Sequence, residues 1–202
     1  MVDVVGAAYD TRAEEYIGLI GDIGQTDAAD RALIAAWRDE TSGPLLDAGC
    51  GPGLWTAFLG DGGRQVTGVD LSERFIDHAR RAYPQRDFRH GSFTDLPFAD
   101  ASIGGILAWY SLIHTPPGDM PAVFAEFGRV LAAGGSILIG FFDGTPRERF
   151  PHAVTPAYFW TADALAEMLE PSGFMLTASE HRARTDDEIS RRPHASLTAV
   201  PR

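Results

Sequence analysis

The segment Leu45–Gly53, with the sequence LLDAGCGPG, constrains the fold more than any other part of the chain. A short apolar run that ends in Asp47 and continues into alternating glycines is typical of a buried strand followed by a tight turn. Because glycine has no Cβ, such a turn allows a ligand to approach the main chain closely. A dinucleotide-binding fingerprint would place its third glycine at the position of Leu54, so the spacing disfavours an NAD-dependent oxidoreductase.

The composition excludes several classes of function. All 17 basic residues are Arg, so the chain has no amine for the Schiff base of an aldolase or a pyridoxal-phosphate enzyme and no P-loop lysine. The formal net charge of −11 opposes binding to a nucleic acid backbone. Because Cys50 is the single cysteine, we expect neither an internal disulfide nor a zinc site of paired cysteines.

The sequence also predicts a location in the cell. The absence of paired cysteines favours a reducing compartment, and the first ten residues, MVDVVGAAYD, show no targeting pattern. The longest largely apolar run, Ile103–Ile113, is too short to span a bilayer. We therefore expect a cytoplasmic protein without membrane contact, as a monomer or a homodimer. Arg in place of Lys, with abundant Ala, Gly and Pro, favours a bacterial source.

Short apolar runs alternate with helical periods, a pattern typical of βαβ units around a parallel sheet. The predicted strands are Pro44–Asp47, Gln65–Val69, Asp87–His90, Ile103–Trp109, Gly135–Phe142, Phe174–His181 and Ala195–Val200. Helices are predicted to start at the caps Ser72 and Thr161, and a further helix is predicted around residues 123–131. Residues 182–193 are polar without a helical period, so we expect the last two strands to form an antiparallel pair.

Two helices are predicted before the first strand, Thr11–Ile20 and Asp27–Glu40, the second capped by Thr26. No strand lies between them, so they are free to cover the sheet. We expect one domain over residues 1–202, with an N-terminal helical cover over 1–42 and the cofactor-binding sheet and substrate pocket over 43–202. The expected fold class is α/β, a Rossmann-like seven-stranded mixed sheet with helices on both faces and the last strands antiparallel.

Four segments in order resemble the class I S-adenosylmethionine-dependent methyltransferases that act on small molecules. The pattern D-x-G-x-G-x-G from Asp47 resembles motif I of that family. The other segments are VTGVDLS at Val66–Ser72, FRHGSFTDLPF at Phe88–Phe98, similar to the adenine-binding stretch, and RVLAAGGSILIGFF at Arg129–Phe142. The resemblance implies the class I methyltransferase fold, S-adenosyl-L-methionine as cofactor and S-adenosyl-L-homocysteine as its product.

The resemblance also implies roles for individual residues. Asp47 would receive the amino group of the cofactor, and Asp70 would accept hydrogen bonds from the ribose hydroxyls. Ser92 stands where many members have Asp, so the adenine contact would be weaker or would pass to Thr94, Asp95 or a backbone carbonyl. The segment Ala8–Tyr16, AYDTRAEEY, is similar to an entry segment of small-molecule members, in which Tyr9, Arg12 or Tyr16 would hold the carboxylate. The expected cofactor set is Tyr9, Tyr16, Asp47, Gly49, Cys50, Gly51, Gly53, Asp70, Leu71, Ser92, Phe93, Thr94 and Trp109.

The residues after the fourth and fifth strands are predicted to face the methyl group, because ligands of open α/β sheets lie beyond the carboxyl ends of the strands. The expected substrate residues are Tyr110, Ser111, Phe141, Phe142 and Trp160. Such an aromatic lining suits an apolar or aromatic acceptor. The alternative for Phe141 and Phe142 is packing against the cover helices.

A general base is needed only where the acceptor loses a proton. His114 is the first candidate and His152 the second, because a near-neutral pKa suits removal of a hydroxyl or phenolic proton. A structural role for His114 remains an alternative. We expect methyl transfer to a small organic acceptor, with oxygen favoured over nitrogen or carbon as the acceptor atom.

Three other classes fit the sequence less well or remain open. A nucleic acid amino-methyltransferase usually has an Asn- or Asp-Pro-Pro-aromatic run where this chain has Trp109–Ser111. A catechol-type enzyme uses an Asp, Asp, Asn metal set, and the chain has no Asn, so no metal is expected. A protein of this fold that binds the cofactor without methyl transfer, as a cyclase or a binding module, remains the alternative.

Overall fold

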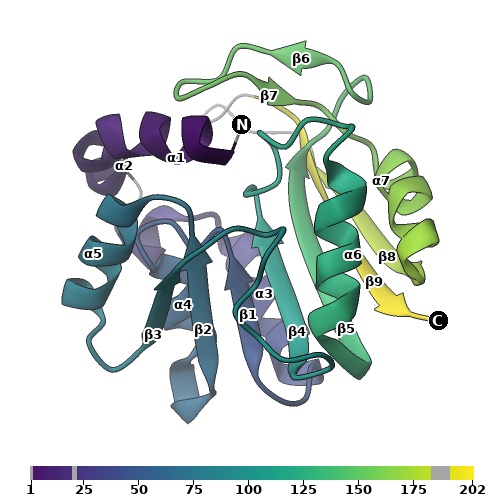
Figure 1. The fold of residues 1–202 in the computed structure, drawn as a ribbon, viewed down its shortest axis with the longest axis horizontal. Coiled ribbons are helices and arrows are strands. Elements are labelled where there is room, and N and C mark those ends of the chain that lie inside the picture. Colours follow the sequence, from purple (N-terminus) through teal and green to yellow (C-terminus); the bar gives the residue numbers. More distant parts are fainter. Residues whose placement is uncertain (1, 20–21, 183–191) are drawn as a thin grey trace.

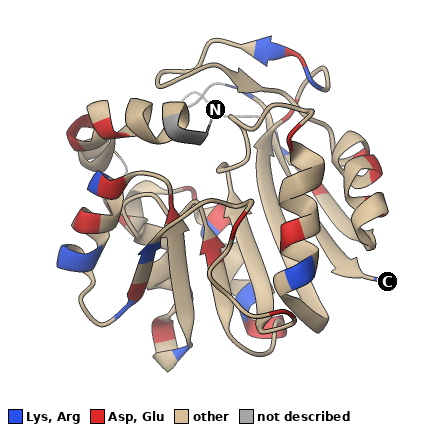
Figure 2. Cartoon of the chain, in the orientation of Figure 1, with Lys and Arg blue, Asp and Glu red and all other residues tan. Residues whose placement is uncertain are grey.

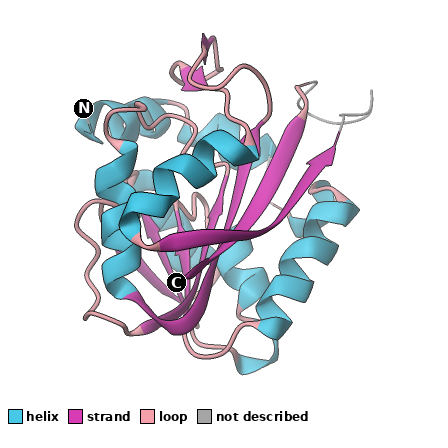
Figure 3. Ribbon diagram, turned by 90° about the vertical axis from the view of Figure 1, so that its right-hand side faces the viewer, coloured by secondary structure: helices cyan, strands magenta, loops and turns pink. Residues whose placement is uncertain are grey.

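A seven-stranded sheet forms the centre of the molecule, with helices on both faces (Figures 1 and 3). The computed structural model describes residues 2–19, 22–182 and 192–202. The strand order is β3-β2-β1-β4-β5-β9-β8. The strands are β1 (Leu45–Ala48), β2 (Val66–Asp70), β3 (Asp87–His90), β4 (Ile103–Trp109), β5 (Leu131–Phe142), β8 (Phe174–Arg182) and β9 (His194–Pro201).

The sheet is mixed, as the sequence predicts. Strands β1 to β5 pair in parallel, whereas β9 pairs antiparallel with both β5 and β8. The predicted class I methyltransferase arrangement is thereby confirmed. The polar connection predicted between the last two strands falls largely on residues 183–191, which lie outside the described part of the chain.

Side chains of the central strands alternate between two hydrophobic layers, because successive residues of a strand point to opposite faces. In β4, Ile106 and Ala108 pack with residues of α6 and α7, whereas Leu107 packs with residues of α3 and α4. Strands β4 and β5 carry no charged residue (Figure 2). The helices are α3 (Ala28–Glu40), α4 (Leu54–Leu59), α5 (Glu73–Ala82), α6 (Met120–Val130) and α7 (Ala162–Leu169).

Two predicted helix starts agree with the structure and one is corrected. The hydroxyl of Ser72 accepts the backbone N–H of Phe75 in the first turn of α5, and the hydroxyl of Thr161 accepts the backbone N–H of Ala164 in the first turn of α7. The cap of α3 is Asp27 and not the predicted Thr26, since a carboxylate oxygen of Asp27 accepts the backbone N–H of Ala29 at 2.7 Å. A carboxylate is the stronger acceptor for an N-terminal N–H group.

The N-terminal cover differs from the prediction. It contains two short helices, α1 (Val2–Thr11) and α2 (Ala13–Leu19), where one helix over residues 11–20 was expected. Three of the first five residues are valines, which have low helix propensity. Tertiary packing offsets that cost, because Gly6 of α1 lies so close to the loop after β2 that a Cβ there would be 2.7 Å from the carbonyl oxygen of Leu71.

Smaller elements complete the fold. A two-stranded hairpin of β6 (Arg149–Phe150) and β7 (Ala157–Tyr158) lies beyond β5, and the sequence does not predict it. Strand β5 begins at Leu131 instead of the predicted Gly135. The 3-10 helices are η1 (Ile23–Gln25), η2 (Asp61–Gly63) and η3 (Glu170–Ser172). Among the described residues, no helix has the length and apolar character needed to cross a membrane.

Candidate functional site

Two adjoining cavities lie where β1, β2 and β4 end and the cover helices pass over the sheet. One cavity, of about 540 Å³, is lined by Trp55, Phe142 and His152 among others, and we name it the aromatic cavity. The motif cavity, of about 520 Å³, is lined by Asp70 and Phe93 among others. Six residues line both cavities: Tyr9, Tyr16, Gly49, Gly51, Trp109 and Tyr110. The glycine turn after β1 is therefore the place where the two cavities meet.

The glycine turn has the geometry that the sequence predicts. Gly49, Gly51 and Gly53 all have positive φ angles, of +81°, +53° and +95°, which favour glycine. A Cβ on Gly49 would lie 2.2 Å from Cβ of Ser111, so the turn packs directly on the loop after β4. A Cβ on Gly51 would meet no atom within 4 Å, which leaves space for a ligand against the main chain.

Asp70 ends β2 and faces the motif cavity. One of its carboxylate oxygens accepts the N–H of Gly51 at 2.8 Å, and the other accepts the N–H of Ser72 at 2.8 Å. Burial raises the pKa of Asp70, and the backbone N–H donors oppose that rise. The carboxylate thus connects the glycine turn to the start of α5 at the wall of the cavity.

Asp47 lies behind the glycine turn and lines neither cavity. Its side chain is 1% exposed, and a carboxylate oxygen accepts the hydroxyl of Thr56 on α4 at 2.7 Å. Burial raises the pKa of Asp47 to about 7. The structure does not bring this predicted partner of an ammonium group to the surface of the site.

Two other members of the expected cofactor set, Cys50 and Gly53, belong to the glycine turn. Cys50 lines the aromatic cavity and is almost fully buried. Gly53 lines neither cavity, and a Cβ there would lie 2.8 Å from Cβ of Ala79 and 2.9 Å from the ring of Phe88. Gly53 therefore serves the close packing of α4 on α5 and β3.

The adenine-like stretch after β3 lies in the motif cavity. Ser92, Phe93 and Thr94 line it, together with Leu71. The hydroxyl oxygens of Ser92 and Thr94 lie 2.9 Å apart. Asp95, the other expected adenine contact, lines neither cavity and pairs with Ser92 in an isolated β-bridge.

Tyr9 and His114 are joined across the site. The hydroxyl oxygen of Tyr9 lies 2.9 Å from Nε2 of His114, and Nδ1 of His114 lies 3.1 Å from the carbonyl oxygen of Pro156. Burial lowers the pKa of His114 and raises the pKa of Tyr9 well above its ordinary value. Both groups are therefore neutral near pH 7.

His152, the second predicted base, lies on the loop between β6 and β7 and lines the aromatic cavity. Its ring packs edge-on against His114, with 4.9 Å between the ring centroids. Burial lowers the pKa of His152 to about 4. The two candidate bases are neighbours, and neither imidazole is positively charged near neutral pH.

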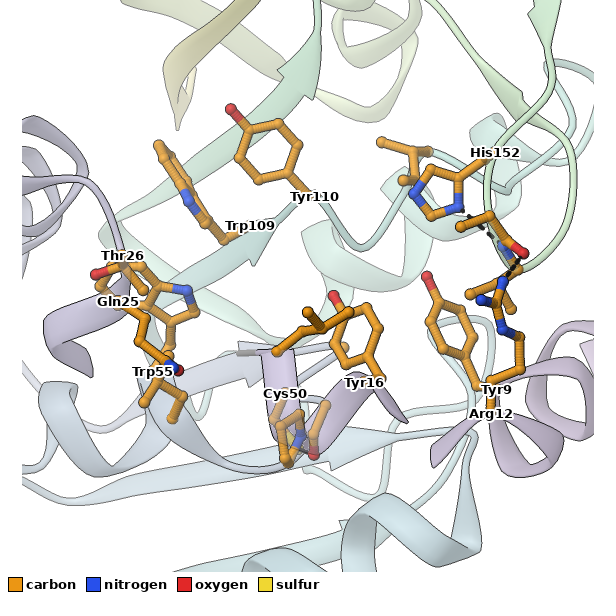
Figure 4. A pocket seen from close by; sticks show the side chains of 18 of the residues that line it. Tyr9, Arg12, Tyr16, Gln25, Thr26, Cys50, Trp55, Trp109, Tyr110 and His152 are labelled. Atoms are coloured by element: carbon orange, nitrogen blue, oxygen red, sulfur yellow. Dashed lines mark hydrogen bonds between the residues drawn. The ribbon is translucent and has the colours of Figure 1, made fainter. Parts of the chain in front are cut away.

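Figure 4 shows how the aromatic cavity extends from Tyr9, Arg12 and His152 at one end to Trp55, Gln25 and Thr26 at the other. Arg12, an expected carboxylate ligand, instead donates to the carboxylate of Glu15 and to the carbonyl oxygen of Ala153.

Tyr110 lies above the middle of the cavity in a left-handed conformation, with φ of +55°. Because this conformation is strained for a residue with a bulky side chain, it is held by its surroundings. The ring of Tyr110 contacts Trp109, Phe142 and His194, at centroid distances of 5.4, 5.1 and 5.7 Å.

The expected substrate residues separate into three groups. Tyr110 and Phe142 line the aromatic cavity, whereas Ser111 lines the motif cavity, where its hydroxyl is buried with no hydrogen-bond partner among the described residues. Phe141 and Trp160 are each 1% exposed and line neither cavity. Side chains at alternate positions of β5 point to opposite faces, so Phe141 packs in the core beneath α6 and α7 while Phe142 faces the cavity.

The sequence analysis missed part of the aromatic cavity. Trp55, Gln25, Asp27 and Asp30 line it. Trp55 lies two residues after Gly53 and at the start of α4, and this closeness to the glycine turn could have indicated that it lines the site. Asp27 caps α3 and Asp30 lies in its first turn. Both carboxylates form ion pairs with Arg182 of β8, at 2.8 and 2.6 Å, a contact that sequence spacing does not encode.

The described part of the chain contains no group of three or more His, Cys, Asp or Glu side chains that could hold a metal ion.

Comparison with known proteins agrees with the geometry of the site. Residues 45–135 match the sequence family described as a methyltransferase domain. The family model, the curated relatives and the solved structures together support a class I S-adenosylmethionine-dependent methyltransferase. The matched region extends from β1 into β5 and contains the glycine turn, Asp70 and the Ser92–Thr94 stretch. The cofactor of this family is S-adenosylmethionine.

Curated relatives are methyltransferases of bacteria and fungi. Over 137 residues the chain is 36% identical to a probable S-adenosylmethionine-dependent methyltransferase of Mycolicibacterium smegmatis, covering 64% of this chain and 51% of the relative. It is 32% identical over 144 residues to an O-methyltransferase of Penicillium expansum, covering 64% of this chain and 51% of the relative. The chain thus spans about half the length of these relatives.

Solved structures show the same fold. The N1-methyltransferase of 1,6-didemethyltoxoflavin from Burkholderia thailandensis, solved with S-adenosylhomocysteine, has a TM-score of 0.78 at 24% identity, covering 98% of this chain and 87% of that chain. The [4+2]-cyclase SpnF has a TM-score of 0.81 at 20% identity, covering 100% of this chain and 97% of that chain. At these identities the similarity establishes the fold alone.

Proposed function

We propose that this chain transfers the methyl group of S-adenosylmethionine to an oxygen atom of a small, largely aromatic acceptor. The observation that carries the proposal is the junction of the two cavities at Gly49 and Gly51. The motif cavity is lined by residues of three of the family motifs, and the aromatic cavity opens from the same glycine turn. A donor in the first and an acceptor in the second would meet at this junction.

The residues of the motif cavity fit the cofactor. Asp70 presents a carboxylate for the ribose hydroxyls, and the open space beside Gly51 accommodates the methionine portion. Burial raises the pKa of Tyr16 to about 12, so its hydroxyl stays a donor for the carboxylate of the cofactor. When bound, the cofactor supplies an already activated methyl group, so the task of the chain is to align the acceptor, exclude water and move a proton.

The acceptor side favours a planar molecule. Trp55, Trp109 and Tyr110 offer aromatic surface, and Trp55 lies edge-on to Trp109 with 6.4 Å between the ring centroids. An O-methyltransferase among the relatives supports oxygen as the acceptor atom. Two neutral histidines beside the junction support it further, because a hydroxyl acceptor has to lose a proton.

We further propose that residues 1–202 act as one domain in which residues 1–42 cover the site. Tyr9 and Tyr16 reach both cavities from α1 and α2. A cover that lies over the junction keeps water away from the reacting atoms.

The experiment is a two-step assay. Calorimetry with S-adenosylmethionine and S-adenosylhomocysteine should give saturable binding, and NAD should give none. A screen of small phenols, hydroxy acids and amines should then identify acceptors that release S-adenosylhomocysteine. Tight cofactor binding without release from any acceptor would favour the alternative of a non-methylating cyclase or binding module, a reading that the fold of SpnF keeps open.

A further inference from the structure

The two hydrogen bonds of His114 define which of its ring nitrogens carries the proton. A carbonyl oxygen only accepts, so the contact with Pro156 at 3.1 Å requires a proton on Nδ1. In the neutral ring Nε2 is then an acceptor, and the hydroxyl of Tyr9 donates to it at 2.9 Å. The two hydrogen bonds therefore run in one direction, from the Tyr9 hydroxyl to Nε2 of the imidazole and from Nδ1 to the main-chain carbonyl of Pro156.

Tyr9 and His114 differ in the cavities that they line. Tyr9 lines both cavities, whereas His114 lines the motif cavity alone and is 7% exposed. A molecule in the aromatic cavity therefore meets the hydroxyl of Tyr9, and Nε2 of His114 is already occupied by that hydroxyl. Direct removal of a proton by His114 would require Tyr9 to move away.

We propose that Tyr9 and His114 act as a proton relay, in which the hydroxyl of Tyr9 receives the proton of the acceptor while it gives its own proton to Nε2 of His114. This inference rests on the proposed function, since it concerns transfer to a hydroxyl or phenol. It gives Tyr9 a catalytic role in place of the carboxylate contact that the sequence implies.

The relay balances protons and charge. The O–H bond of the acceptor breaks as its new O–C bond forms. The S–C bond of the donor breaks with its electron pair kept by sulfur, so that S-adenosylhomocysteine is the leaving group, and one O–H bond of Tyr9 is exchanged for another. An N–H bond forms at Nε2, so the positive charge of the sulfonium donor ends on the imidazolium of His114. That cation can donate to both Tyr9 and Pro156, and it returns its proton to solvent after the product leaves.

The groups around the relay keep both members in the required protonation state. Tyr16 from α2 and Asp70 from β2 raise the pKa of Tyr9 beyond the effect of burial, so its proton remains in place. Burial lowers the pKa of His114, so the ring is neutral and Nε2 can accept the proton that Tyr9 gives. His152 packs on His114 from the loop after β6, and its pKa of about 4 keeps it uncharged. The nearby cations Arg12 and Arg192 act on His152.

A measurement on the free chain tests the arrangement without any acceptor. Nitrogen-15 NMR of histidine-labelled protein, with His114 assigned by loss of its signals in His114→Gln, should show the tautomer protonated at Nδ1. The substitution Tyr9→Phe should raise the pKa of His114, because it removes a donor that favours the neutral ring. Protonation at Nε2, or an unchanged titration in Tyr9→Phe, would overturn the relay.

Turnover of substituted phenols tests the chemistry. Tyr9→Phe and His114→Gln should each lower kcat by about 10²–10⁴-fold, and the double variant should lose no more than either single variant. The loss should shrink for nitrophenols that are already ionised at the assay pH. Tyr83→Phe, at the residue that follows α5, and His78→Gln, on α5, are the matched controls, because both residues lie outside the two cavities.

Multiplicative losses in the double variant, or equal losses for neutral and ionised phenols, would contradict the relay. If the unmodified chain releases no S-adenosylhomocysteine from any acceptor in the broad screen, the proposed function fails, and the NMR result still decides the proton arrangement. The two failures are therefore distinguishable.

Discussion

The N–H group of Gly51 donates to a carboxylate oxygen of Asp70 at 2.8 Å, which joins the turn after β1 to the end of β2. The second carboxylate oxygen accepts the N–H of Ser72 at the start of α5. One side chain thus holds together the two segments that would contact the methionine and ribose portions of the cofactor. The same residue is placed to bind ligand and to organise the turn.

Asp70→Ala should weaken binding of S-adenosylhomocysteine by roughly 1.5–3 kcal/mol, because it removes charge-assisted hydrogen bonds to the ribose. Calorimetry measures the affinity and thermal unfolding the stability. Thr161→Ala is the control, since it removes the hydroxyl that caps α7, and Thr161 lines neither cavity. It should cost about 1 kcal/mol of stability with little change in affinity. If Asp70→Ala behaves like this control, the ribose role is wrong.

Residues that line one cavity alone allow donor and acceptor binding to be separated. Trp55 lines the aromatic cavity and Phe93 the motif cavity. Trp55→Ala should raise the acceptor KM by about tenfold, the size expected for loss of one aromatic contact, and leave the Kd of S-adenosylhomocysteine unchanged. Phe93→Ala should do the reverse. Equal effects of both variants on both constants would show that the cavities do not divide donor from acceptor.

Much of the fold could be predicted from local signals. The short apolar strands, the glycine turn and the caps at Ser72 and Thr161 are each contained in a few consecutive residues, and the structure agrees with them. The N-terminal helix α1 could not be predicted, because its valine-rich sequence disfavours a helix in isolation and contacts with α5 stabilise it.

The site was predictable in its motifs but not in its contacts. Sequence order places Asp70, Gly49 and Gly51 at strand ends, and the structure brings them to one cavity. The contact between Tyr9 and His114 spans 105 residues, and no spacing rule encodes it. Strand alternation predicts that Phe141 and Phe142 point to opposite faces of the sheet. Which of them faces the cavity depends on where α6 and α7 pack, and the sequence does not give that position.

Asp47 should make the stability of the ligand-free chain depend on pH. Burial raises its pKa from 3.8 to about 7, so the folded chain holds this proton more tightly than the unfolded chain does. Its contribution to stability is present at low pH and is lost as the pH rises towards 7. Asp47→Asn should therefore raise the unfolding free energy at pH 8 by on the order of 1–4 kcal/mol, with little gain at pH 4. Chemical denaturation at the two pH values measures this, and an equal change at both would show that Asp47 is not protonated on folding.

The cover is joined to the cofactor side of the sheet by Asp10 of α1. Its carboxylate accepts the hydroxyl of Ser72 at 2.5 Å and the backbone N–H of Arg74 at 3.2 Å. Asp10→Ala should loosen α1 from α5, so trypsin should cleave after Arg12 several-fold faster than in the unmodified chain.

Bound S-adenosylhomocysteine should slow that cleavage in the unmodified chain. Ligand in the motif cavity would contact Tyr9 and Tyr16, which line it, and would thereby hold α1 and α2 in place. Asp77→Ala, an exposed position on α5, is the matched control and should leave the rate unchanged. Mass spectrometry identifies the cleaved bond and its rate. Cleavage after Arg12 at one rate with and without S-adenosylhomocysteine would contradict a cover that closes over the cofactor, because the ligand would then stabilise the sheet without stabilising α1 and α2.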